Sequence, residues 1–416
     1  MDKAEIMGFG LASLAIFRGV GEDIVIKNLI KLTRGNLSPD AAVDCYCELV
    51  SKLSGKPYYM NLFDYVTELV LYADNVFSRE SAGGNYIKLP IYMKDAISRD
   101  LTYLSTAACF SAKDLKAFLS SRFPEYAQVI GNLAEYTTHK GKYNNICSDF
   151  SEEMAHFAEF YRKNGFSNYA KSRVFVYSDD FAFLPVLNFS APAVSSFIGY
   201  EEKRKIILDN TKALCSKAPA NNVLLYGDRG TGKSSTVKAL VSEFADCGLR
   251  LVQLSKPQLH LLGRVMEEIR DLPFPFVIFL DDISFSANDD GFTCLKAALE
   301  GSVVERPPNC AVYATSNRRH FVKENFADRE GDEIHLGDTI DETLSLFDRF
   351  GITVTYSSPE EEEYFAMVLE LAKRGGLEIG TDELISGARR YSIIKSGHSP
   401  RVAVQYIDLL KGGKAF

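Results

Sequence analysis

Hydrophobic residues recur at two different spacings along the chain, and the change comes near residue 171. In the first part the apolar positions follow the spacing of helices with one buried face. Residues 101–104 fit a helix and a strand equally well, and Asp40 is a candidate N-cap for the run that follows it. We therefore expect residues 1–170 to form a mainly helical domain. The runs with helical spacing are 8–17, 24–32, 41–53, 62–70, 115–119 and 150–161.

After residue 198, short apolar runs alternate with stretches of helical spacing. This alternation predicts a parallel β-sheet with helices on both faces, so we assign residues 198–357 to an α/β domain. After Pro359 only helical spacing remains, which predicts a small helical lid over residues 358–416. The predicted strands are 222–226, 249–254, 276–280, 310–315 and 352–356, the helices of the α/β domain are 201–214, 235–241, 258–270 and 291–299, and those of the lid are 360–373, 381–391 and 399–410.

Residues 171–197 follow neither pattern. Two aromatic-rich runs, 174–177 and 181–184, are separated by Asp179 and Asp180 and are followed by prolines. Such runs are typical of short strands or of an extended chain. We interpret the segment as a connector between the helical domain and the α/β domain.

Composition and charge narrow the class of protein. The 416 residues suffice for two or three domains, and 46% hydrophobic with 25% charged residues is ordinary for a soluble protein. A net charge of −8 gives no overall attraction to nucleic acid or to anionic lipid. The scattered cysteines lack paired metal-ligand spacing and indicate reduced thiols. Without an apolar run near the roughly 20 residues of a membrane span, and without a targeting segment, a cytoplasmic protein and no membrane partner are expected.

The clearest chemical signal is a glycine-rich run with the spacing G-x-x-x-x-G-K-[ST] between a predicted strand and a predicted helix. Its glycines let several backbone N–H groups point at one centre, and the helix N-terminus adds partial positive charge. Lys233 can reach the terminal phosphates of ATP, and the Ser234 hydroxyl can ligate Mg²⁺. A glycine-rich turn that binds nothing is the disfavoured alternative, because every fixed position matches. The run is Gly227, Asp228, Arg229, Gly230, Thr231, Gly232, Lys233 and Ser234, followed by Ser235.

Two of the predicted strands end in polar residues. Asp281 and Asp282 follow the strand 276–280, and Asn317 closely follows the strand 310–315. Ligands of open α/β sheets bind at the carboxyl ends of strands, so Asp281 is placed to hold the hydration shell of Mg²⁺. Asp282 could accept a proton from the attacking water, and Asn317 could orient that water. Aspartates that end a strand and an asparagine that caps one are the simpler alternatives.

Two arginines complete the set of candidate site residues. Arg349 precedes the last predicted strand and could place its guanidinium on a γ-phosphate bound by a neighbouring subunit. An ordinary surface arginine paired with Asp348 is the alternative. Arg401 starts a lid helix and could reach the phosphates of its own subunit. We therefore expect a homo-oligomer in which Arg349 acts in trans.

In this order the elements resemble the Walker A, Walker B, sensor 1, arginine finger and sensor 2 motifs of AAA+ ATPases. Ile198, Gly199 and Tyr200 resemble the segment that lines the adenine pocket in that superfamily. Three runs resemble, more narrowly, the bacterial AAA+ family catalogued as domain of unknown function 815, and this resemblance covers residues 195–416. It implies a P-loop AAA+ fold, ATP and Mg²⁺ as ligands, and hydrolysis of ATP, but it names no client. The three runs are 226–235, 314–320 and 348–351.

Two departures from the AAA+ pattern affect the expected activity. AAA+ proteins usually carry glutamate at the position of Asp282, and aspartate is one methylene shorter, so hydrolysis could be slow. Residues 253–262 lack the aromatic-hydrophobic-glycine tripeptide with which AAA+ unfoldases grip polypeptide. An ATPase that remodels or regulates a protein client is therefore the first hypothesis. A nucleotide-gated interaction module with little hydrolysis is the second, a loader of nucleic-acid complexes is the third, and a small-molecule P-loop kinase is disfavoured.

The segment between Asn317 and Arg349 has an unusual charge. Residues 324–342 contain eight acidic side chains against one basic side chain. The segment could contact a basic partner, although a solvated loop is the simpler interpretation. The basic residues that directly follow Asn317 could face a neighbouring subunit or nucleic acid. Without a wider basic surface we favour the subunit, so nucleic acid is the less favoured partner. These basic residues are Arg318, Arg319 and His320.

Overall fold

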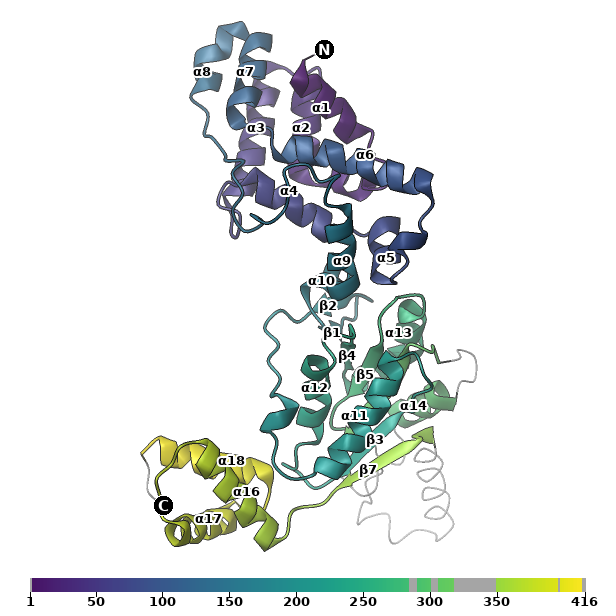
Figure 1. Ribbon diagram of the computed structural model, residues 1–416, viewed down its shortest axis with the longest axis vertical. Helices are drawn as coiled ribbons and strands as arrows, with labels where there is room; N and C mark the ends of the chain where they lie inside the picture. Colours follow the sequence, from purple (N-terminus) through teal and green to yellow (C-terminus); the bar gives the residue numbers. More distant parts are fainter. Residues whose placement is uncertain (1, 284–289, 301–305, 318–348, 396, 414–416) are drawn as a thin grey trace. The chain divides into compact units, whose positions relative to one another are not determined.

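The structure is a computed structural model that describes residues 2–283, 290–300, 306–317, 349–395 and 397–413. The chain divides into two compact units, Met1–Lys171 and Ser172–Phe416, which are described separately below (Figure 1). Several residues singled out above lie outside the described residues. They are the acidic segment 324–342, Arg318, Arg319, His320 and Asp348.

The N-terminal unit is mainly helical, as the spacing of its apolar residues predicts. Neighbouring helices pack side by side, for example α1 against α2 and α2 against α3 (Figure 1). The ambiguous residues 101–104 are helical, because they lie inside α6 and bury Leu101 and Leu104. The helices are α1 (Lys3–Ala12), α2 (Ile24–Arg34), α3 (Pro39–Ser54), α4 (Leu62–Leu71), α5 (Val76–Ala82), α6 (Ile91–Ala108), α7 (Ala112–Arg122), α8 (Ala127–Gly131), α9 (Met154–Asn164) and α10 (Ser167–Lys171).

Two helix starts differ from the sequence-based expectation. Ser38, not Asp40, caps α3, because its Oγ accepts the Ala41 N–H at 3.3 Å and Pro39 fits the first helical position. Helix α9 begins at Met154, about one turn later than expected. Asp149 holds the preceding residues in a turn by accepting the Ser151 N–H at 2.9 Å. Local side-chain bonds to the backbone therefore set both boundaries.

A fully buried carboxylate organises the chain between α1 and α2. Asp100, on α6, has no exposed surface. Its Oδ2 accepts the backbone N–H groups of Ala15, Ile16 and Phe17 at 2.8, 2.7 and 3.0 Å. Arg99 donates to the other oxygen at 2.9 Å. The carboxylate satisfies donors that would otherwise be buried without an acceptor, and so it fixes the path of the loop.

The C-terminal unit is built on a seven-stranded sheet in the order β2-β1-β4-β5-β6-β3-β7. Every neighbouring pair is parallel except β1 and β2. The strands are β1 (Val174–Tyr177), β2 (Phe183–Pro185), β3 (Val223–Gly227), β4 (Arg250–Leu254), β5 (Phe276–Leu280), β6 (Cys310–Ser316) and β7 (Ile352–Tyr356), and the helices that flank them are α11 (Glu201–Cys215), α12 (Lys233–Glu243), α13 (Leu262–Ile269) and α14 (Asp290–Glu300).

Two segments of this unit depart from the expected pattern. The residues interpreted as a connector contain β1 and β2, which form one edge of the sheet, so the sheet begins before residue 198. Val174, Phe175 and Tyr177 are buried, and this burial holds β1 against β4. The helix expected over 258–270 is divided into a 3-10 helix, Lys256–Leu261, and α13.

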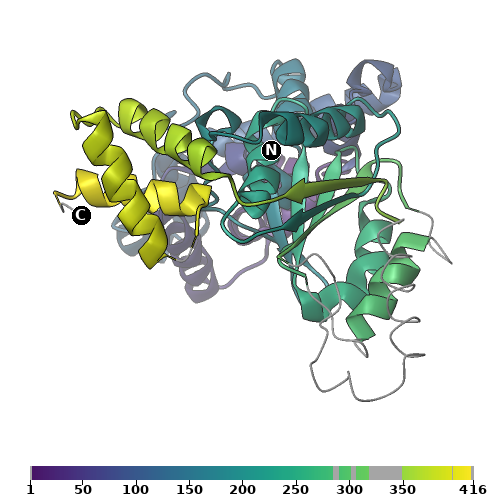
Figure 2. The same cartoon turned by 90° about the horizontal axis from the view of Figure 1, so that it is seen from below.

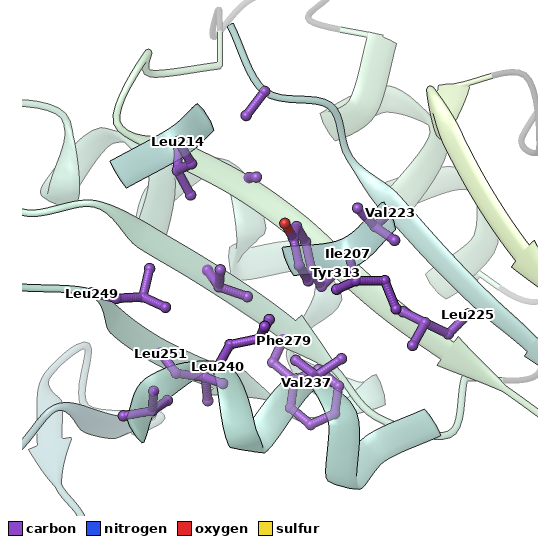
Figure 3. Close-up of a cluster of buried hydrophobic side chains, with 14 of the residues drawn as sticks. Ile207, Leu214, Val223, Leu225, Val237, Leu240, Leu249, Leu251, Phe279 and Tyr313 are labelled. Carbon is purple, nitrogen blue, oxygen red and sulfur yellow. The ribbon is translucent and has the colours of Figure 1, made fainter. Parts of the chain in front are cut away.

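One hydrophobic cluster joins α11, α12 and one face of the sheet (Figure 3). Tyr313 of β6 is the one labelled side chain in the cluster with a polar atom, and its hydroxyl is satisfied. It accepts from Asn210 Nδ2 at 2.9 Å and shares a 2.8 Å hydrogen bond with Thr211 Oγ1. The cluster therefore fixes the helix that follows the glycine-rich loop against the strand that precedes it. Its labelled members are Ile207, Leu214, Val223, Leu225, Val237, Leu240, Leu249, Leu251, Phe279 and Tyr313.

Three helices after β7 pack against one another around a core of their own (Figure 2). They are α16 (Glu361–Arg374), α17 (Thr381–Ile394) and α18 (Pro400–Lys411), and they form the small lid that the sequence predicts. Tyr364, Val368, Ala388 and Ala403 are among the side chains buried between them. Within the described ranges, every helix is too short or too polar to cross a lipid bilayer.

Replacing Asp100 tests the buried anchor of the N-terminal unit. Asp100→Ala leaves three N–H groups without their acceptor, so we expect the unit to lose about 3 kcal/mol of stability. Hydrogen exchange measured by mass spectrometry should show faster exchange at the amides of residues 15–17. The control is Asp95→Ala, because Asp95 is exposed on the same helix. Equal exchange at these amides in the two variants would contradict the anchoring role.

Candidate functional site

The glycine-rich loop connects the end of β3 to the start of α12. Strand β3 is an interior strand of the sheet, between β6 and β7. Gly227, Gly230 and Gly232 have φ angles of 126°, 76° and 94°, a region that residues with a side chain rarely adopt. A Cβ on Gly227 would lie 2.2 Å from the Tyr356 carbonyl oxygen. The loop therefore needs glycine for its backbone conformation and for its close approach to β7.

Lys233, the first residue of α12, lies inside the curl of this loop. Its side chain is 5% exposed, and Nζ donates to the carbonyl oxygens of Gly227 at 2.9 Å and Asp228 at 2.6 Å. Burial lowers the pKa of Lys233 to about 8, although the negative charges of Asp228 and Asp282 oppose this effect. The ammonium group thus lies beside the backbone of the loop and the N-terminus of a helix, the position where phosphate oxygens would bind.

Two hydroxyl groups donate hydrogen bonds to the carboxylate of Asp281, which directly follows β5. Ser234 Oγ donates to Asp281 Oδ1 at 2.5 Å, and Thr315 Oγ1 donates to the same oxygen at 2.8 Å. Lys238 Nζ lies 3.6 Å from Asp281 Oδ2. Hydroxyl and carboxylate oxygens are the donors that Mg²⁺ prefers, so Ser234 and Asp281 fit this ion. Sequence reasoning missed Thr315 and Lys238, although Lys238 lies one helical turn after Ser234 and so shares its face of α12.

Asp282 and Asn317 contact each other directly. Asn317 Nδ2 donates to Asp282 Oδ1, and both residues are at least partly accessible to solvent. Asp282 has a φ of 53°, in the left-handed region, which aspartate tolerates better than most residues do. Thr315 supports this backbone, because its Oγ1 accepts the Asp282 N–H at 2.8 Å and its carbonyl accepts the Ile283 N–H at 2.8 Å.

The segment that resembles an adenine-lining motif lies beside the chain that leads from β7 to the lid. Gly199 and Tyr200 have φ angles of 75° and 59°, and Ile198 before them is half-buried. The Tyr200 ring packs on the Tyr356 ring, with 5.2 Å between centroids. Its hydroxyl donates to the Ser357 carbonyl at 2.7 Å, and burial raises the pKa of Tyr200 to about 12.

The first turn of the lid helix α18 touches the glycine-rich loop. The Arg401 backbone N–H donates to the Gly230 carbonyl at 3.2 Å. A Cβ on Gly230 would lie 2.9 Å from Ser399 Oγ and 3.3 Å from Arg401 Cβ. The Arg401 side chain is exposed, and its positive charge lowers the pKa of Lys233 in addition to the larger effect of burial. The structure therefore brings Arg401 to the same side of the loop as Lys233.

The other candidate residues of the loop divide between exposed and buried positions. Arg229 is exposed and Ser235 is half-buried. Thr231 is 2% exposed, and its Oγ1 donates to the Asp228 carbonyl at 2.8 Å. The Asp228 carboxylate turns towards the lid and accepts the Ser358 N–H at 2.7 Å. Asp228 therefore ties the loop to the start of the lid.

Arg349 does not join this group. It is exposed and precedes β7, so it lies at the amino ends of the strands, whereas the glycine-rich loop lies at their carboxyl ends. A Cβ on the nearby Gly351 would lie 2.6 Å from Asn221 Oδ1, just before β3 begins. The sheet therefore separates Arg349 from the loop of its own chain.

The fold and this geometry define the class of protein. The strand before the glycine-rich loop lies between β6, which leads to Asn317, and β7, which leads to the helical lid. This is the α/β P-loop architecture of AAA+ proteins, and it confirms the fold predicted from the sequence. The chain belongs to the family described as "Protein of unknown function (DUF815)", whose model matches residues 170–414. No curated protein matches the sequence.

Three solved structures align with about half of this chain. A mutant of RuvB from Thermotoga maritima is 19% identical, with a TM-score of 0.38 over 53% of this chain and 64% of the RuvB chain. The chain thus spans just under two-thirds of the RuvB length. The AAA domain of FIGL-1 in complex with ADP is 20% identical over 53% of this chain and 73% of that one, with a TM-score of 0.35. PCH-2 from C. elegans is 16% identical over 54% and 68%, with a TM-score of 0.37.

Replacing Lys233 tests the phosphate-binding role of the loop. Lys233→Ala removes the ammonium group, so we expect affinity for a fluorescent ATP analogue to fall at least about tenfold. Lys212→Ala is the matched control, because Lys212 is exposed at the end of α11. Unchanged affinity in the Lys233 variant, with a melting temperature equal to that of the wild type, would contradict the site.

Proposed function

We propose that the protein binds ATP with Mg²⁺ and hydrolyses it to ADP and phosphate. One observation supports this most strongly. Side chains from the glycine-rich loop and from the ends of two neighbouring strands meet at the carboxyl ends of the parallel strands. Asp281 contacts Ser234, and Asp282 contacts Asn317. Such a group, beside a buried lysine at the N-terminus of α12, has the chemistry that phosphoryl transfer requires.

Each of these residues then has a separate task. The loop amides and Lys233 hold the β- and γ-phosphates, and Ser234 and Asp281 hold Mg²⁺ together with water molecules. Mg²⁺, when bound, supplies positive charge that offsets the charge of the phosphates. Thr315 positions Asp281 by donating to its Oδ1 at 2.8 Å, so it acts through that carboxylate.

Asp282 and Asn317 orient the attacking water. Asp282 accepts a proton from the water as its oxygen approaches the γ-phosphate, and Asn317 holds water and phosphate in line. Asp282 Oδ1 already accepts a hydrogen bond from Asn317. Because the aspartate side chain is also shorter than the usual glutamate, we infer that the general base reaches the water poorly and that hydrolysis is slow.

Arg349 completes the site of a neighbouring subunit in a homo-oligomer. From Arg349 to Tyr356 at the end of β7 the backbone covers about 20 Å along the strand, so Arg349 starts about that far from the glycine-rich loop of its own chain. A neighbouring copy can present the same arginine to the γ-phosphate and neutralise charge in the transition state.

The lid and the N-terminal unit carry the nucleotide signal to a client. Arg401 contacts the loop through its backbone and lies close enough to Lys233 to affect its pKa, so it can sense the γ-phosphate. We propose a functional division into residues 1–170, which contact a protein client in the cytoplasm, residues 198–357, which bind ATP, and the lid 358–416. Remodelling or regulation of that client would be driven by turnover.

The geometry of Asp282 also favours a second candidate function. A carboxylate that is short, strained in φ and bonded to Asn317 suits a protein that binds ATP and rarely hydrolyses it. In that case the bound nucleotide would act as a switch. The N-terminal unit would bind or release its partner according to whether ATP is present.

Mixing two inactive variants tests whether Arg349 acts in trans. Arg349→Ala should bind ATP normally and lose about 10³-fold in turnover, and Lys233→Ala should bind ATP too weakly to hydrolyse it at the concentration used. In a mixture, Lys233→Ala subunits can supply Arg349 to Arg349→Ala subunits, so phosphate release should partly recover. The control is the same mixture with the double variant Lys233→Ala/Arg349→Ala, which should not recover. Wild-type turnover by Arg349→Ala alone would exclude the role.

Lengthening the general base separates the two candidate functions. If Asp282 limits hydrolysis by its reach, Asp282→Glu should raise the rate of phosphate release about tenfold or more, because a well-placed base contributes about 10²–10⁴. Asp282→Asn, which cannot accept the proton, should fall below the wild type. Fast wild-type turnover that Asp282→Glu does not raise would exclude the slow switch and favour the remodelling ATPase.

A further inference from the structure

Four side chains of the N-terminal unit gather around the carboxylate of Glu68, on α4. Tyr143 Oη donates to Glu68 Oε2 at 3.2 Å, and Lys142 Nζ lies 3.4 Å from the same oxygen. Burial, the charge of Glu68 and a hydrogen bond to it raise the pKa of Tyr58. Burial and the same charge also raise the pKa of Tyr72. We call these five residues the Glu68 cluster.

Part of the Glu68 carboxylate reaches the solvent, and the lysine beside it is exposed and held loosely. The Glu68 side chain is 16% exposed and the Lys142 side chain is 55% exposed. A lysine bound firmly to a carboxylate usually lies within 2.7–2.9 Å of it, so the 3.4 Å contact is long. Lys142 can therefore leave the carboxylate without any change in the backbone, and another cation can take its place.

The groups around Glu68 select for an ammonium ion. Lys142 Nζ lies 4.8 Å from the centroid of the Tyr143 ring, and Lys171 Nζ lies 5.5 Å from that of Tyr72. Aromatic faces attract cations at these distances, and a carboxylate adds the opposite charge. The chain's own lysines thus occupy the positions that a primary ammonium ligand would take.

A strained turn borders the cluster. Tyr59 and Met60, directly after Tyr58, have φ angles of 47° and 67°, although neither is glycine. The fold holds this turn in place, because the Met60 N–H donates to the Leu53 carbonyl at 2.7 Å and its carbonyl accepts the Thr137 N–H at 2.8 Å. Strain that the surroundings maintain in this way is concentrated at functional sites. The turn leaves the Tyr59 side chain 66% exposed beside the cluster.

One wall of the cluster is a loop that a buried carboxylate fixes. Asp64, one turn before Glu68 on α4, is 6% exposed. Its oxygens accept the backbone N–H groups of Gly141 at 3.2 Å, Lys142 at 2.7 Å and Tyr143 at 3.3 Å. The Tyr143 ring is therefore presented by a loop that is bonded at three successive residues. Such a pre-formed wall loses little freedom on binding a ligand.

We propose that the Glu68 cluster binds a lysine side chain of a polypeptide partner, and that Lys142 occupies the carboxylate until the partner displaces it. A polypeptide fits better than a free amine, because the exposed Tyr59 provides a flat aromatic surface next to the charged site for residues that flank the lysine. The site is separate from the nucleotide chemistry, so the proposal stands or falls independently of ATP hydrolysis.

The test uses the full chain and a capped peptide with one central lysine between tyrosine and glycine residues. Calorimetry should give a dissociation constant of about 0.1–1 mM for the wild type, and norleucine in place of lysine should abolish binding. Glu68→Gln should weaken binding at least about tenfold, because it removes the charge but keeps an oxygen acceptor for the tyrosine hydroxyls. Lys142→Met should strengthen binding about threefold or more by removing the internal competitor.

Glu125→Gln is the matched control, because Glu125 is an exposed acid elsewhere on the same unit, and it should bind like the wild type. Equal affinity of Glu68→Gln and Glu125→Gln for the lysine peptide would overturn the proposal. If Glu68→Gln fails to fold, the Lys142→Met variant decides, and the absence of any gain in affinity would refute the site. Binding of spermidine without binding of the peptide would also overturn the assignment to a polypeptide.

Discussion

The close approach of Gly227 to the Tyr356 carbonyl is the contact on which the rest of the proposed nucleotide site depends. No side chain fits between them, since a Cβ would lie 2.2 Å from the oxygen. The approach lets the Asp228 N–H donate to the same carbonyl at 2.8 Å, and the Asp228 carboxylate then holds Ser358 at 2.7 Å. Because Gly227 has no Cβ, the loop can therefore form direct hydrogen bonds both with the last strand and with the start of the lid.

The sheet register determines which polar residues can act together. Leu280 of β5 pairs with Ala314 of β6, and Thr315 pairs with Leu225 of β3, two residues before Gly227. Asp281, the residue that directly follows β5, therefore lies level with Thr315 and within reach of Ser234. Because β7 runs parallel to β3, Arg349, which precedes β7, lies at the amino-terminal ends of the strands and the loop lies at their carboxyl ends. A site that needs this arginine is complete only in an assembly, which is why we infer an oligomer.

Buried carboxylates have a recurring role in the N-terminal unit. Asp100 and Asp64 each accept three backbone N–H groups from loops that are distant in the sequence. These bonds replace regular secondary structure where the chain turns, because a charged acceptor can satisfy several donors at once. Glu68 differs from both, since its partners are side chains and part of its surface is open. Rigid loops therefore surround a carboxylate that remains accessible.

The sequence alone determined the α/β fold and the lid, and it located the glycine-rich loop between a strand and a helix. Periodicity decides between helix and strand locally, and residues other than glycine rarely adopt the φ angles found at Gly227, Gly230 and Gly232. It did not determine that β1 and β2 join the sheet, because a short aromatic strand becomes stable only when β4 covers it. Nor did it reveal Thr315 beside Asp281 or Tyr143 beside Glu68, since each pair comes from different elements. Contacts between distant residues follow from packing and register, and only the tertiary structure decides them.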